Sequence, residues 1–114
     1  MNGIPFRVNG KGQVLVSWMS RNKAYWSVSD EGATRFGSPV ATPDGGKRRE
    51  ELSAAVANRK GEVLFVWLNG KRLEWALYRT DGKFTGKQGV AGEQASDNKP
   101  TAFVGADDTF YIVF

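Results

Sequence analysis

A run of arginines and glutamates carries the densest group of chemically capable side chains in this chain. Arg48, Arg49, Glu50 and Glu51 follow one another directly before a predicted strand. The planar guanidinium fork of arginine suits bidentate binding of a carboxylate. One interpretation is therefore a ligand site near the mouth of a ring of strands. The alternative is a solvated loop whose charges bind no ligand.

The chain has no cysteine and no histidine, which narrows the chemistry further. Disulfides and thiolate chemistry are excluded, and the commonest metal ligand and general base are missing. Asp107 and Asp108 are better explained by an ordinary turn than by a weak Ca²⁺ site. We therefore predict no catalytic residue, no metal and no cofactor in this chain.

Tryptophans recur at a fixed spacing, which indicates the same task performed twice. Trp75 follows Trp26 by 49 residues. Packing between neighbouring structural units is one interpretation. Sugar binding is the other, since aromatic rings pack on apolar surfaces and ligand pockets form between packed elements. On that hypothesis the ligand-binding residues pair each tryptophan with an arginine and add the charged run: Trp26 with Arg21, Trp75 with Arg72, and Arg48 and Arg49.

These residues lie within a longer repeat of a polar turn followed by an apolar strand that ends on an aromatic. The strands end on Trp18, on Trp67 and on Phe114, at spacings of 49 and 47 residues. A repeat of about 40–50 residues made of short strands is typical of a β-propeller blade. We therefore predict an all-β fold of four-stranded antiparallel meander units, two complete and half of a third.

Turn signals and alternating patterns place the strands of these units. The dipeptides Asn69-Gly70 and Asp81-Gly82 favour tight hairpins. A helical turn over 49–54 is the alternative to an early start of the fifth strand. We treat 1–114 as one segment with blade 1 at about 3–43, blade 2 at about 51–93 and a half-blade at 100–114. The predicted strands are 4–8, 13–19, 23–29, 34–41, 52–57, 62–68, 72–78, 84–91, 100–104 and 109–114.

The stretch Ser-Val-Ser-Asp-Glu-Gly-Ala-Thr-Arg-Phe at 27–36 resembles the Asp-box of sialidases and other BNR-repeat propellers, which reads Ser/Thr-x-Asp-x-Gly-x-Thr-Trp/Phe. Asp30, Gly32 and Thr34 match, whereas Val28 replaces the serine and Phe36 comes one residue late. The units as a whole resemble the C-terminal blades of bacterial sialidase-like proteins.

The resemblance implies structural roles for the turn residues. The aspartate accepts backbone N–H bonds, the glycine supplies a positive φ and the aromatic packs beneath. Asp30 and Gly32 take these roles in the first copy, and Asp81 and Gly82 take them in a more degenerate second copy.

The resemblance also carries implications for the function of the chain. Sialidases clamp a carboxylate with three arginines and use a tyrosine nucleophile with a glutamate, together with an aspartate acid/base. Tyr111 aligns with Leu15 and Leu64 inside a strand, which predicts a core position instead. We expect a non-catalytic propeller segment that serves as a scaffold or carbohydrate-binding interaction module. The alternative is part of a sialidase-type exo-glycosidase whose other blades are missing.

Charge and hydropathy bear on partners and location. The net charge is +4, with 16 basic residues against 12 acidic ones, and this mixture predicts a solvated surface rather than a nucleic-acid footprint. No apolar run is long enough to span a bilayer. The resemblance implies an extracytoplasmic location, although the chain begins without a signal peptide. Because propellers close with four to eight blades, we consider a head-to-tail dimer that completes a ring.

Overall fold

The computed structural model describes residues 6–8, 12–43, 50–93 and 101–113. Over these residues the chain is all-β, with antiparallel strands and no helix, and therefore no helix able to cross a membrane. The predicted all-β class and the four-stranded antiparallel units are confirmed. The strands are β1 (Phe6–Val8), β2 (Val14–Ser20), β3 (Lys23–Val28), β4 (Val40–Ala41), β5 (Glu51–Ala57), β6 (Glu62–Asn69), β7 (Arg72–Arg79), β8 (Phe84–Glu93), β9 (Thr101–Val104) and β10 (Phe110–Val113).

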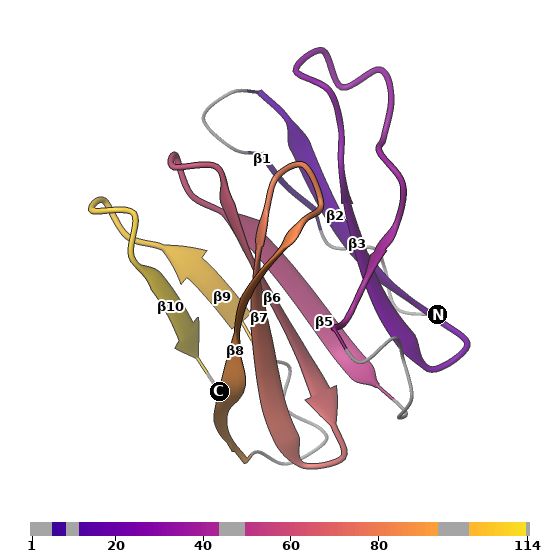
Figure 1. Ribbon diagram of the computed structural model, residues 1–114, viewed down its shortest axis with the longest axis vertical. Helices are drawn as coiled ribbons and strands as arrows, with labels where there is room; N and C mark the ends of the chain where they lie inside the picture. Colours follow the sequence, from indigo (N-terminus) through magenta and orange to yellow (C-terminus); the bar gives the residue numbers. More distant parts are fainter. Residues whose placement is uncertain (1–5, 9–11, 44–49, 94–100, 114) are drawn as a thin grey trace.

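The described strands form three sheets, each a meander in chain order. Sheet 1 has the order β1-β2-β3-β4, sheet 2 has the order β5-β6-β7-β8, and sheet 3 pairs β9 with β10. In Figure 1 the sheets lie side by side, with sheet 2 between the indigo sheet 1 and the yellow sheet 3. The sheets described here do not close into a ring.

The hairpin turns follow from residues that accept positive φ. Arg21 and Asn22 connect β2 to β3 with φ values of 52° and 64°, and a type I′ turn requires a positive φ at both positions. Gly70, at the equivalent turn of sheet 2, has a φ of 65°. Arg21 therefore lies at an exposed hairpin tip.

The fourth strand of the first unit is shorter than the predicted 34–41. Only Val40 and Ala41 pair with β3, and Phe36 makes an isolated bridge with Ser29. Pro39 has no N–H to donate to a ladder, which breaks the pairing. The helical alternative over 49–54 is wrong for its described residues, since β5 begins at Glu51 and carries a bulge there.

Sheet 2 buries both of its faces, which explains the continuous apolar run in β6. Phe65 and Trp67 belong to a cluster with residues of sheet 1 such as Trp26. Leu64 and Val66 point to the opposite face and belong to a second cluster with Ala102 of sheet 3. A strand covered on both faces has no polar alternation, and all residues from Val63 to Leu68 are buried.

Glu50 joins sheet 1 to the start of sheet 2. Its carboxyl group accepts hydrogen bonds from the Ala24 backbone N–H at 2.8 Å and from the Thr42 hydroxyl at 2.6 Å. Its own N–H donates to the Asn22 carbonyl at 2.7 Å. The residue is 1% exposed. Two predictions are therefore wrong for Glu50: that it lies in a solvated loop, and that it faces a ligand at the mouth of a ring. Its side chain is buried and hydrogen-bonded between the two sheets.

Candidate functional site

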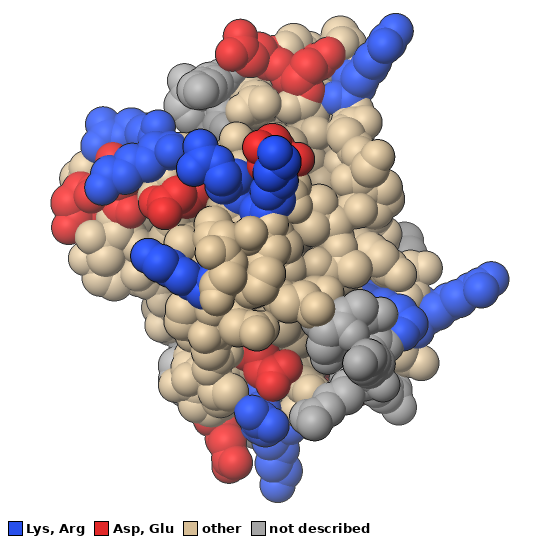
Figure 2. All heavy atoms as spheres, viewed as in Figure 1, with Lys and Arg blue, Asp and Glu red and all other residues tan. Residues whose placement is uncertain are grey.

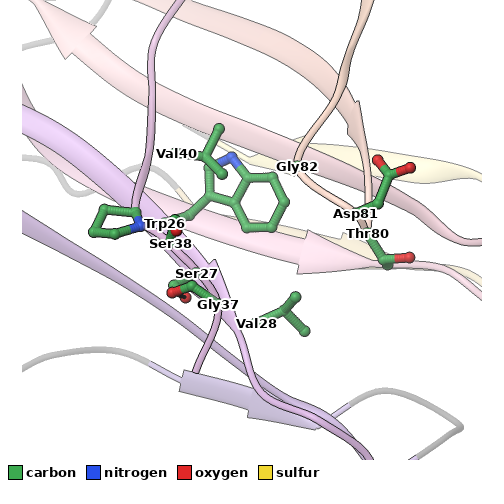
Figure 3. A pocket seen from close by; sticks show the side chains of 10 residues that line it. Trp26, Ser27, Val28, Gly37, Ser38, Val40, Thr80, Asp81 and Gly82 are labelled. Atoms are coloured by element: carbon green, nitrogen blue, oxygen red, sulfur yellow. Dashed lines mark hydrogen bonds between the residues drawn. The ribbon is translucent and has the colours of Figure 1, made fainter. Parts of the chain in front are cut away.

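A cavity of about 310 Å³ lies where sheet 1 meets the β7–β8 turn of sheet 2. Figure 3 shows the lining residues on β3, on β4 and the segment before it, and on that turn. Its walls are mostly small or apolar, with a few hydroxyls and one carboxylate. The lining residues are Trp26, Ser27, Val28, Gly37, Ser38, Pro39, Val40, Thr80, Asp81 and Gly82.

Local hydrogen bonds fix the walls of this cavity. The Ser27 hydroxyl donates to the Gly37 carbonyl at 2.8 Å, which holds the segment before β4 against β3. Across the cavity, an Asp81 carboxylate oxygen accepts the Lys83 N–H at 3.0 Å. Gly82 has a φ of +93°, and a Cβ there would lie 3.3 Å from a Val40 methyl group. Glycine is therefore favoured at this turn by its backbone and by its close neighbour.

Trp26 contributes a buried wall rather than an open ring face. The residue is 0% exposed, and its ring meets the Tyr78 ring edge-on at 5.5 Å. Among the described residues its indole Nε1 has no hydrogen-bond partner. Arg21 does not line the cavity, because it lies at the hairpin tip. The structure therefore does not unite the predicted pair Trp26 and Arg21.

The second predicted pair is also separated. Trp75 packs in the cluster between sheet 2 and sheet 3, and a Cβ on Gly89 would lie 3.0 Å from its Nε1. Arg72 is three residues away on the same strand, so it points to the other face. There its guanidinium lies 3.6 Å from the Glu74 carboxylate. Arg48 and Arg49 lie outside the described residues.

The turn that resembles an Asp-box has the expected aspartate bonds but not the expected glycine or aromatic. Asp30 accepts the Thr34 N–H at 2.8 Å and the Thr34 hydroxyl at 2.7 Å. The positive φ falls on Ala33, at 56°, rather than on Gly32. Phe36 is 50% exposed rather than buried beneath the turn. The carboxylate bonds, not the glycine, therefore define this turn.

Replacing Thr34 by valine is expected to raise the pKa of Asp30. The Thr34 hydroxyl, followed by the Thr34 N–H, holds that pKa below its ordinary value of 3.8. A depressed folded-state pKa contributes stability above the unfolded value, and this stability is lost as the pH falls through the folded value. The wild-type advantage over the variant should therefore be present near neutral pH and disappear in acid. NMR titration of the Asp30 carboxyl carbon measures the shift.

Thr85→Val provides the matched control, because the Thr85 hydroxyl donates to the Leu77 carbonyl and not to Asp30. It should leave the titration of Asp30 unchanged. An Asp30 curve that is the same in Thr34→Val as in the wild type would contradict the assignment.

Asp107 and Asp108 lie in the turn between β9 and β10, as the sequence predicts. Asp107 accepts the Thr109 N–H at 3.1 Å. Asp108 accepts both the backbone N–H and the side-chain Nε–H of Arg59, each at 3.1 Å. Hydrogen bonds from Thr109 and from Arg59, respectively, lower the pKa of these two carboxyl groups. Within the described ranges, no three His, Cys, Asp or Glu side chains gather closely enough to hold a metal ion.

Asn58 was not singled out in the sequence analysis, which also predicted the wrong environment for Tyr111. Asn58 is 5% exposed, and its side-chain oxygen accepts the N–H groups of Lys60 and Glu62, each at 3.0 Å. Asparagine before a Lys-Gly turn was the available signal. Tyr111 is 44% exposed on the outer face of sheet 3, so its predicted core position is wrong. The alignment with Leu64 gives the correct face, but no described sheet covers that face.

On the face shown in Figure 2, basic side chains stand beside acidic ones rather than forming one continuous basic surface.

A scan against protein-family models and searches of curated proteins and of solved structures found no match to this chain. Hydroxyls and one carboxylate around apolar walls are equipped to bind a small polar molecule.

Proposed function

We propose that the chain is a non-catalytic, sialidase-like β-propeller segment that acts as a scaffold and interaction module, with carbohydrate as its ligand class. The cavity between sheet 1 and sheet 2 is the observation that carries this proposal. It lies between two successive copies of the same unit, and ligand pockets form preferentially between packed elements. Ser38, Thr80 and Asp81 bring polar groups to it. Such groups suit the hydroxyls of a sugar.

The repeat supports the proposed role of the chain as a scaffold. Trp26 packs between sheet 1 and sheet 2, and Trp75, 49 residues later, packs in the cluster between sheet 2 and sheet 3. Equivalent residues thus perform equivalent packing in successive units. Propeller blades stack in the same manner, each burying its faces against its neighbours.

The structural roles of several acidic residues support the proposal that the chain is not catalytic. Glu50 is buried between Ala24 and Thr42, and Asp30 is committed to its turn. Asp108 is paired with Arg59. A general acid or base needs access to its substrate, and these carboxyl groups already serve the fold.

Titration calorimetry with monosaccharides, including sialic acid and fucose, tests the ligand class. We expect measurable binding heat for the wild type and at least a tenfold loss of affinity in Ser38→Trp. The reason is that Ser38 lines the cavity and is itself exposed, so an indole there would fill the space without entering the core.

Ser20→Trp is the matched control, because Ser20 is exposed at the end of β2 and does not line the cavity. It should bind as the wild type does. Flat heats across the sugar panel would contradict carbohydrate as the ligand class. Release of product from a sialoside by the purified chain would instead support the exo-glycosidase alternative.

A further inference from the structure

Two sheet faces at opposite ends of the stack carry apolar side chains that no described sheet covers. On sheet 1, the Trp18 ring stacks with the Tyr25 ring at 5.8 Å, on the face away from sheet 2. On sheet 3, Phe103 stacks with Tyr111 at 5.1 Å, and Val113 is 54% exposed beside them. We call these the sheet 1 end face and the sheet 3 end face.

The internal repeat allows the sheet 3 end face to be compared with the equivalent faces of sheet 1 and sheet 2. Leu15, Leu64 and Tyr111 occupy the same position in successive units and are 1%, 4% and 44% exposed. Leu15 packs against sheet 2, and Leu64 packs in the cluster shared with sheet 3. In each case the next sheet along the chain provides the cover. Tyr111 lies on the same face of its own unit, where the next sheet would lie.

The sheet 1 end face shows the complementary relation. Val16 and Trp18 correspond to Phe65 and Trp67, which lie 49 residues later on the face of sheet 2 that sheet 1 covers. Phe65 is 0% exposed and Trp67 is 4% exposed, whereas Val16 and Trp18 are only half-buried. The sheet 1 end face therefore has the pattern of a surface that receives a preceding sheet.

We propose that the sheet 3 end face of one copy docks on the sheet 1 end face of a second copy. This inference rests on the proposed propeller-type stacking and names its partner. The contact is heterologous, since it joins two different surfaces. Such a contact closes into a ring where the rotation permits and otherwise extends. The apolar, aromatic character of both end faces suits the centre of a protein interface.

Mixing two variants that each damage one end face tests the docking. Val16→Lys places a charge on the sheet 1 end face, and Val113→Glu places a charge on the sheet 3 end face. We expect light scattering to give an assembly of at least twice the monomer mass for the wild type and a monomer for each variant alone. An equimolar mixture should recover a species of twice the monomer mass, because one intact contact forms and the second places Lys opposite Glu.

Each other outcome overturns the docking. A monomeric wild type at high concentration removes it, and so does a mixture that stays monomeric. An assembly that persists in Val16→Lys points instead to contact between two sheet 3 end faces. Circular dichroism verifies that each variant folds, and Tyr25→Lys on the same face replaces Val16→Lys if that variant does not. The sugar titration measures binding heat and light scattering measures the mass of the assembly, so failure of one proposal is distinguishable from failure of the other.

Discussion

Replacing Glu50 by alanine is expected to lower the free energy of unfolding by about 3–5 kcal/mol. The substitution removes the acceptor of the Ala24 N–H and of the Thr42 hydroxyl, both in a buried setting. A buried polar group that loses its partner costs about 1–3 kcal/mol, and the lost side chain leaves a void as well. Because small domains are stable by only about 5–15 kcal/mol, chemical denaturation would detect this change readily.

Two further substitutions sharpen the Glu50 experiment. Glu50→Gln keeps the size and one acceptor oxygen, so it should cost less, about 1–2 kcal/mol. Glu31→Ala removes an exposed glutamate from the 30–34 turn and should change stability by no more than about 0.5 kcal/mol. Equal effects of Glu50→Ala and Glu31→Ala would show that the junction between sheet 1 and sheet 2 does not depend on this carboxyl group.

Phe65→Ala is expected to destabilise the fold by about 3–5 kcal/mol, the usual range for truncating a buried aromatic residue. Phe65 is 0% exposed in the centre of β6, on the face that sheet 1 covers. Its ring meets the Trp67 ring at 5.5 Å and the Tyr78 ring at 6.4 Å. Truncation therefore empties the middle of the contact between the two four-stranded sheets.

Phe36→Ala gives the comparison for the same change of side chain. Phe36 is 50% exposed, so its truncation should cost less than about 1 kcal/mol. Urea denaturation of both variants measures the difference. A cost for Phe65→Ala as small as that for Phe36→Ala would contradict the packing of sheet 1 on sheet 2.

Local signals in the sequence predicted the strands well. The stretch predicted at 62–68 is observed as β6, Glu62–Asn69, and the stretch predicted at 23–29 is observed as β3, Lys23–Val28. Alternating or continuous apolar runs and turn dipeptides act over a few residues, so they can be read without knowing the fold. The repeat near 49 residues extended this reading to whole sheets.

The candidate site was harder to predict because it depends on residues far apart in the chain. The cavity is lined both by Ser27 and by Asp81, and no local pattern in the sequence places these two residues around one cavity. The repeat predicts Arg21 beside Trp26, yet a two-residue turn places Arg21 at an exposed hairpin tip. The repeat also predicts Arg72 beside Trp75, but these two side chains lie on opposite faces of β7. Strand parity alone would have excluded that second pair.

Hydrogen exchange measured by mass spectrometry over a range of protein concentrations tests most directly whether successive sheets cover one another as repeats. We predict that β6, buried on both faces, exchanges most slowly at every concentration. The strands β2 and β10 should gain protection together as the concentration rises, because each carries one of the two docking end faces. Exchange of β6 as fast as that of β10, or protection of β10 without β2, would contradict the account.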